Sequence, residues 1–285
     1  MKTILVPTDF SKNADNALKY AIEFAKKEQS KLIILHAYQI NYSEAYIAFD
    51  VLAEEKNNLR TEAESKLKAL SLRLKSEDNI NSELLCADDF TVDAILETIK
   101  NKNVDLVVMG TRGATGLQEF LFGSNTAKVI RNAKCPVIAV PQDATFRPLK
   151  KITYATDYLA TDINDLKKIV EFANEFKAQV TVLHVTEEIM SKESEEDSMR
   201  IFKNASLKEI NYPDLNFKLV KGGDIEKTLA DFVNTDTTDL LVTSVHHRDI
   251  LDRIFSKNIS KNLSYHTKVP LMAFHHTSSS VSITF

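Results

Sequence analysis

The 285-residue sequence predicts an α/β fold of two tandem open parallel five-stranded sheets, each flanked by helices. Short β-branched runs alternate with helical patterns along the whole chain, which is typical of parallel strands joined by crossover helices. The second half also repeats the strand segments of the first half in the same order. These observations predict two similar domains, residues 1–144 and 145–285, with a polar linker near 142–150.

The repeat can be followed through a few matched residues. Asp9, which follows the first strand segment, returns as Asp157, 148 residues later, and His36, which ends the next one, returns as His184 at the same spacing. The later strand segments return only 134 residues on, so the first copy is 14 residues longer in its middle. We place this extra length at 41–55, as a lid or an extra helical turn.

Amphipathic stripes between the strand segments predict the helices of the first copy. The first helix covers 14–27, with Ser11 as its N-cap. A long, heavily charged helix follows over 53–75, and shorter ones are expected over 92–101 and 125–131.

Composition excludes several classes of protein. The net charge of −4 gives no general attraction to nucleic acid or anionic membranes. No apolar run is long enough to span a membrane, and the first strand begins at Thr3, which leaves no room for a signal peptide. Cys86 and Cys135 form no disulfide framework, and we expect both to be buried thiols. The sequence thus predicts a cytoplasmic protein that binds neither nucleic acid nor membrane.

Glycines gather in residues 109–125, which hold four of the six in the chain. Gly110 and Gly113 follow an apolar run that predicts a buried strand, and Gly123 precedes a helical segment. Glycine lets backbone N–H groups approach a phosphate without a Cβ clash and permits positive φ. A helix start adds free N–H groups that favour an anion. Since ligands of open parallel sheets bind beyond the carboxyl ends of the strands, this stretch predicts a phosphate site there.

The spacing of these glycines resembles the nucleotide-binding signature of the universal stress protein family. That signature is Gly, two residues, Gly, nine residues, Gly, then Ser or Thr, and Gly110, Gly113, Gly123 and Ser124 match it in full. The resemblance covers nearly the whole chain, in a tandem two-domain form. It implies a Rossmann-like fold of the adenine nucleotide alpha hydrolase type. It also implies a bound adenine nucleotide, which is ATP, ADP or AMP, with Mg²⁺ as an accompanying ion.

The same resemblance assigns the site residues by position. It places Thr8 and Asp9 near the ribose or the phosphates and the backbone of Ala37 at the adenine. Arg112 supplies positive charge to the phosphates. The full set that it implies is Pro7, Thr8, Asp9, Ala37, Met109, Gly110, Arg112, Gly113, Gly123, Ser124 and Asn125.

The second copy lacks this signature. At the 134-residue spacing, its four positions become Ser244, His247, Lys257 and Asn258. We therefore predict that the second domain does not bind ATP in the family's manner and serves as a pairing partner for the first. The resemblance implies that the last strand of each domain makes this contact. Two such chains could also associate as a homodimer.

Three functions remain in view. The leading one is an ATP-binding regulatory protein of the stress response that acts through an unidentified protein partner. The second is a slow ATPase or another nucleotide hydrolase. The sequence offers no clear general base beyond Asp9, no Gly-x-x-x-x-Gly-Lys loop and no two-carboxylate metal site, so we assign no catalytic residue. The third is an interaction module that binds no nucleotide.

Other polar residues have simpler interpretations. Asp157 is expected only to cap a helix, whereas Asp9 is expected to contact a ligand or a bridging metal. His36 and His184 are expected to make structural hydrogen bonds, because both copies keep them. A four-histidine cluster at one sheet edge could bind a transition metal, although ordinary surface histidines are the simpler alternative. Its members are His246, His247, His275 and His276.

Overall fold

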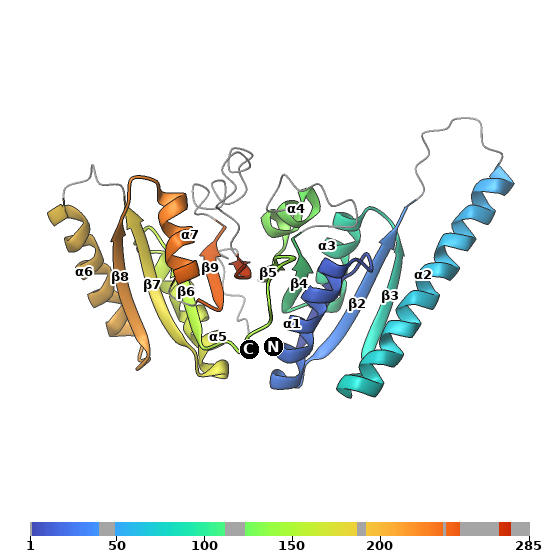
Figure 1. Cartoon of the computed structure of the whole chain (residues 1–285), viewed down its shortest axis with the longest axis horizontal. Helices are drawn as coiled ribbons and strands as arrows, with labels where there is room; N and C mark the ends of the chain where they lie inside the picture. Colours follow the sequence, from blue (N-terminus) through green and yellow to red (C-terminus); the bar gives the residue numbers. More distant parts are fainter. Residues whose placement is uncertain are drawn as a thin grey trace.

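The computed structural model describes residues 2–39, 49–111, 123–186, 192–235, 238–245 and 268–274. Within these ranges the two halves of the chain lie side by side and repeat one order of strands and helices (Figure 1). The elements of the first half are β1 (Thr3–Pro7), α1 (Lys12–Glu28), β2 (Lys31–Tyr38), α2 (Phe49–Asp78), β3 (Ser82–Asp88), α3 (Thr91–Lys102), β4 (Leu106–Gly110), α4 (Ser124–Asn132) and β5 (Val137–Val140). Those of the second half are β6 (Lys151–Ala155), α5 (Asp162–Phe176), β7 (Gln179–Thr186), α6 (Lys192–Glu209), β8 (Leu215–Lys221), α7 (Ile225–Thr235), β9 (Leu240–Ser244) and β10 (Leu271–Phe274).

The four predicted helices of the first half are present, each slightly longer than expected. Ser11 caps α1, since its Oγ atom accepts a hydrogen bond from the Ala14 N–H at 3.2 Å. Much of the extra length of the first copy lies in α2, which has 30 residues against 18 in α6. The predicted lid at 41–55 falls partly outside the described residues, and its last part belongs to α2.

The predicted α/β class is confirmed, and the two expected sheets join into one sheet of ten strands. The strand order is β3-β2-β1-β4-β5-β10-β9-β6-β7-β8. All neighbouring strands are parallel except β5 and β10, which pair antiparallel with Met272 opposite Ile138. The last strand of each half therefore makes the contact between halves. Because β5 and β10 each have a neighbour on both sides, a homodimer would need another surface.

Two apolar layers cover the sheet. Helices α1, α2, α5 and α6 pack on one face, and α3, α4 and α7 pack on the other. On the first face the halves meet directly, because the ring of Phe24 in α1 lies 6.4 Å from Phe172 and 5.7 Å from Phe176 in α5. The segment between the halves is also held in place, since the Asn16 amide donates to the carbonyl oxygens of Pro141 and Ala144. The strand pairing, the aromatic contacts and these hydrogen bonds thus fix the two halves together.

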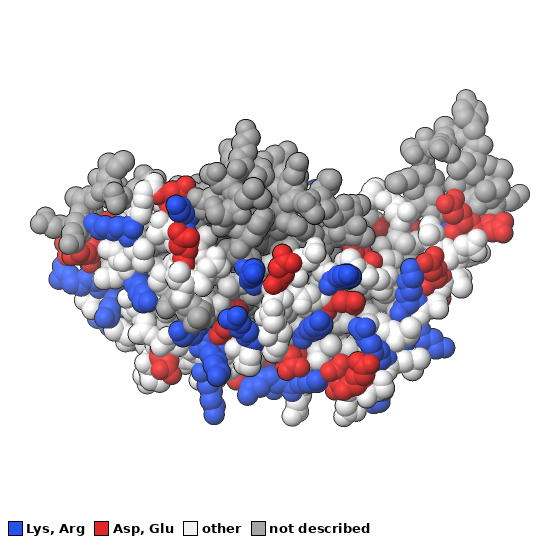
Figure 2. Space-filling model, viewed as in Figure 1, with Lys and Arg blue, Asp and Glu red and all other residues white. Residues whose placement is uncertain are grey.

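One face of the molecule carries mixed charge. On the face shown in Figure 2, Lys and Arg side chains alternate with Asp and Glu side chains over both halves. None of the described helices has both the length and the apolar character needed to cross a lipid bilayer.

Candidate functional site

The candidate site of the first half lies where the strand order reverses. Strand β1 lies between β2 and β4. The chain first adds β2 and β3 on one side of β1 and then adds β4 and β5 on the other side. Thr8 follows β1, Ala37 lies near the end of β2, and Gly110 ends β4. The carboxyl ends of parallel strands share one edge, and a crevice forms there at such a reversal. The structure therefore brings together these three predicted site residues from distant parts of the sequence.

The turn after β1 is held by its own side chains. The Thr8 hydroxyl accepts a hydrogen bond from the Phe10 N–H, and Oδ1 of Asp9 accepts one from the Ser11 N–H, both at 3.0 Å. Phe10 adopts a left-handed conformation with φ of 60°, which is uncommon for a bulky residue. Asp9 is partly exposed at this edge of the sheet. The turn thus orients its carboxylate at this edge of the sheet.

His36 fastens this turn to the neighbouring strand. Its Nδ1–H donates to the Thr8 carbonyl oxygen at 2.7 Å, and its ring lies 4.6 Å from the Phe10 ring. The predicted structural hydrogen bond is confirmed. The carbonyl fixes the tautomer, since only a protonated Nδ1 can donate to it.

The second half repeats the same contact. His184 donates through Nδ1 to the Thr156 carbonyl oxygen at 2.7 Å, and its ring lies 4.8 Å from the Tyr158 ring. The second half adds a carboxylate, because Oε2 of Glu195 lies 3.4 Å from Nε2 of His184. Burial and the charge of Glu195 raise the pKa of Tyr158 well above its usual value. The histidine contact therefore belongs to the fold of both halves, while its surroundings differ.

The described ends of the glycine-rich stretch lie side by side. The Gly123 N–H donates to the Thr111 carbonyl oxygen at 2.6 Å, and the Thr126 hydroxyl donates to the Gly110 carbonyl oxygen at 2.9 Å. The start of α4 is thus tied to the end of β4. Ser124 opens this helix on the exposed side. A ligand beyond β4 would meet the free N–H groups of the first helical turn.

The remaining predicted site residues differ in burial. Asn125 follows Ser124 and is exposed, and Met109 is buried within β4. Pro7 is buried at the end of β1. Arg112 and Gly113 lie outside the described residues.

Gly110 is a glycine for a reason that the sequence did not suggest. A Cβ atom at this position would lie 2.1 Å from Oδ1 and 2.8 Å from Cγ of Asn13. Its φ is not in the left-handed region, and Gly123 has a φ of −66°, which any residue can adopt. Neither Gly110 nor Gly123 therefore depends on the positive φ that glycine permits. Gly110 instead makes room for the side chain of Asn13.

The second half has other residues at the positions of Gly110 and Asn13. Ser244 stands at the position of Gly110, is fully buried, and donates through its hydroxyl to the Phe274 carbonyl oxygen at 3.4 Å. At the 148-residue spacing, Thr161 replaces Asn13 and is exposed. Asp162 and Asp165 replace two alanines of α1, and both have 0% exposure. The second half thus has buried carboxyl groups at the start of α5, where the first half has methyl groups.

The prediction for Asp157 is wrong. Helix α5 begins at Asp162 with Thr161 as its N-cap, five residues after Asp157. Asp157 lies instead beside His184, with 3.8 Å between Oδ1 and Nδ1. The turn before α5 is held by Asp162, which accepts hydrogen bonds from the Thr156 hydroxyl at 2.5 Å and the Leu159 N–H at 3.1 Å.

The histidine cluster cannot be placed. His246, His247, His275 and His276 lie outside the described residues, as do Lys257 and Asn258. Among the residues that are described, no group of three or more His, Cys, Asp or Glu side chains is arranged to hold a metal ion.

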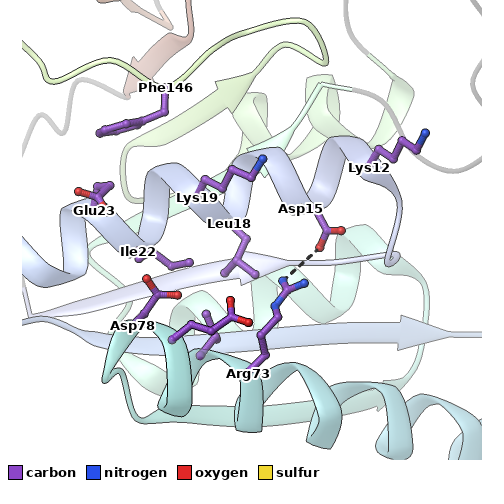
Figure 3. A pocket seen from close by; sticks show the side chains of 11 residues that line it. Lys12, Asp15, Leu18, Lys19, Ile22, Glu23, Arg73, Asp78 and Phe146 are labelled. Atoms are coloured by element: carbon purple, nitrogen blue, oxygen red, sulfur yellow. Dashed lines mark ion pairs between the residues drawn. The ribbon is translucent and has the colours of Figure 1, made fainter.

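A separate groove of about 650 Å³ runs between α1 and α2 (Figure 3). Charged side chains of both signs line it, and an ion pair joins Arg73 to Asp15 across it at 3.7 Å. Phe146 lies at its border, on the side of α1 away from α2. The groove lies on the face of the sheet that α1 and α2 cover and includes none of the predicted nucleotide-site residues.

Sequence reasoning missed three residues of this region. Phe10 had a signal, because both copies place an aromatic residue directly after the Thr-Asp pair. Thr126 and Asn13 had none, since their importance depends on contacts with β4 that only the folded chain shows.

Comparison with known proteins agrees with this architecture. A model of the universal stress protein family matches residues 1–141 and 148–275. Universal stress protein MJ0531 of Methanocaldococcus jannaschii is 32% identical over 142 residues, which is 49% of this chain and 81% of that protein. Universal stress protein YxiE of Bacillus subtilis is 31% identical over 144 residues, which is 48% of this chain and 97% of that protein. Each of these relatives therefore corresponds in length to one half of the chain.

A solved structure matches both halves together. The universal stress protein from Archaeoglobus fulgidus superimposes with a TM-score of 0.69 and 17% identity, covering 98% of this chain and 97% of its own. At that identity the match supports the shared fold alone. Because the family model covers most of both halves, the chain belongs to the universal stress protein family and carries two copies of the family domain in tandem.

Proposed function

We propose that this protein is an ATP-responsive regulatory protein of the stress response, which binds one adenine nucleotide in its first domain, residues 1–144. The second domain, 145–285, holds no nucleotide and supports the first through the β5–β10 pairing. The protein acts in the cytoplasm, and the conformation of its nucleotide loop is read by a protein partner.

The observation that carries the proposal is the junction of β4 and α4. Hydrogen bonds from Gly123 and Thr126 bring both ends of the glycine-rich stretch to one point at the carboxyl edge of the sheet. The turn around Asp9 follows β1, which is the neighbour of β4, so this turn and the first turn of α4 lie at the same edge of the sheet. A nucleotide there would gain helix N–H groups for its phosphates and the charge of Arg112 from the adjoining loop.

The second half supports the proposal of a single site. The buried carboxyl groups of Asp162 and Asp165 lie in the first turns of α5, where a phosphate would otherwise find a favourable helix terminus. Ser244 also places a buried side chain at the position where the first half has Gly110 packed against Asn13. The buried carboxyl groups disfavour an anionic ligand at this helix terminus.

Regulation is favoured over catalysis on the described residues. Asp9 is the one carboxylate that the resemblance assigns to the site, and its Oδ1 atom already accepts the Ser11 N–H. A Mg²⁺ ion there would depend mainly on oxygen atoms of the phosphates and water, as this ion commonly does. Slow ATP hydrolysis remains the alternative function. Turnover near background at saturating ATP and Mg²⁺ would favour the regulatory role.

The test is to count bound nucleotide. Protein purified under native conditions is denatured, and the released nucleotide is identified by mass spectrometry and quantified by absorbance. Titration calorimetry with ATP should then give one site per chain. The double variant Gly113→Val, Gly123→Val should lose binding.

A matched control is available in the second half. A Cβ atom on Gly223 would meet no atom within 4 Å, so Gly223→Val should bind ATP like the wild type. Equal ATP binding by the Gly113, Gly123 double variant would refute the site assignment. Two ATP molecules per chain would refute the single-site proposal.

A further inference from the structure

Asn13 has an unusual environment. It is the second residue of α1 and is only 3% exposed. Neither its Oδ1 nor its Nδ2 atom has a hydrogen-bond partner among the described residues. A buried amide that loses its hydrogen bonds to water and gains none in return costs folding free energy. The position therefore calls for a partner that the described residues do not provide.

The place of Asn13 points to the nature of that partner. Its side chain lies against the Cα of Gly110, in the space that a Cβ would take. It thus stands between the start of α1 and the end of β4, next to the reversal of strand order between β1 and β4. This is the crevice in which the proposed nucleotide would bind. The Asn13 amide therefore lies at the proposed nucleotide site.

The two halves provide an internal comparison. The first half combines Asn13 with Gly110, whereas the second half has Thr161 and Ser244 at the matching positions. Thr161 is exposed and Ser244 donates to a backbone carbonyl, so the second half keeps no buried amide here. The half that has the glycine signature is also the half with the unsatisfied amide.

We propose that Asn13 is a phosphate-contacting residue of the first-half site, with its Nδ2 group donating to a phosphate oxygen of the bound nucleotide. The assignment rests on the proposed nucleotide binding. A phosphate suits this position because the N-terminus of α1 carries partial positive charge. An amide donates to an anion without adding a charge that would need compensation in the absence of the ligand.

The test compares ATP with adenosine on three full-length variants by titration calorimetry. Asn13→Asp keeps the shape of the side chain but replaces the donor with a carboxylate, which repels phosphate. It should weaken ATP binding at least about tenfold, since hydrogen bonds to charged groups are the stronger ones, and leave adenosine binding unchanged. Asn13→Leu removes the donor without adding charge and should weaken ATP binding less. Asn58→Asp, at an exposed position of α2, controls for the added charge and should change neither affinity.

Thermal unfolding without ligand separates binding from structure. Asn13→Leu removes the unsatisfied amide, so its melting temperature should equal or exceed that of the wild type while its ATP affinity falls. Wild-type ATP affinity in both Asn13 variants would refute the role of Asn13 and leave the proposed function standing. Parallel loss of ATP and adenosine binding would show a structural role and also refute it. A wild-type chain that binds neither ligand would refute the proposed function and this inference together.

Discussion

The Oδ1 atom of Asn13 lies 2.1 Å from the point where a Cβ atom on Gly110 would stand. The substitution Gly110→Ala should therefore destabilise the protein by roughly 1–3 kcal/mol, the usual cost of overpacking a close-packed site. Asn13 is buried and short, so it cannot swing aside at low cost. Urea unfolding followed by circular dichroism would measure the change.

A double-mutant cycle identifies Asn13 as the cause. In an Asn13→Ala background the clash with the amide is absent, and Gly110→Ala should cost clearly less than in the wild type. A residual cost is expected, because the added Cβ would still lie 3.2 Å from the backbone carbonyl carbon of Asn13. Equal costs in the two backgrounds would contradict this explanation of the glycine.

The seam between the halves is sensitive to charge. Ala273 in β10 is paired with Val137 of β5 and is 1% exposed. Ala273→Asp would bury an uncompensated carboxylate and should cost about 3 kcal/mol or more. Asn216→Asp introduces the same residue at an exposed position of β8 and should change stability by less than about 0.5 kcal/mol. Similar urea midpoints for the two variants would show that this seam contributes little to stability.

The two cysteines should differ in reactivity. Cys135 is 7% exposed, and burial raises the pKa of its thiol to about 12. Cys86 is only partly buried, contrary to the expectation that both thiols are buried, and burial raises its pKa more weakly. Alkylation by iodoacetamide at pH 8, followed by peptide mass spectrometry, should therefore label Cys86 slowly and Cys135 only after unfolding. Equal labelling rates in the native protein would contradict the buried position of Cys135.

Much of the fold could be predicted from local patterns. The repeat of Asp9 and His36 at one spacing identified two copies of one topology, and apolar periodicity located the helices of the first copy. Strands β3 and β8 were not located, because their residues are largely polar or partly exposed and lack the continuous apolar run of a central strand. The joining of two sheets into one depends on pairing between β5 and β10, which residue patterns within either half do not contain.

In the candidate site, too, local patterns predicted some residues and missed those that depend on tertiary contacts. Thr8, Ala37 and Gly110 were predicted because each follows or ends a strand, and parallel strands bring such positions together. Asn13 was not predicted, because the sequence around an asparagine at the start of a helix does not show whether its side chain is buried. The contact between Gly110 and Asn13 was not predicted either, because the two residues are distant in the sequence and meet only in the folded chain.

Glu83 should make stability depend on pH in the acidic range. This residue of β3 pairs with Lys102 of α3, at 2.7 Å, and with Lys31 of β2. Hydrogen bonds from Lys102 and then Lys31 lower the pKa of Glu83 below its usual value of 4.5. A carboxyl group whose pKa is lower in the folded state stabilises the protein above the unfolded pKa. This contribution is lost as pH falls through the folded pKa.

The variant Glu83→Gln tests this sign. At pH 7 it should lower the free energy of unfolding by up to about 1 kcal/mol, since partly exposed ion pairs are screened by water. The difference from the wild type should shrink as pH falls from about 4.5 towards the lower folded pKa, because the wild-type carboxyl then becomes neutral like the amide. Glu171→Gln, at an exposed position of α5, serves as the control. A Glu83→Gln effect that stays constant from pH 7 to pH 3 would arise from packing and not from the two lysines.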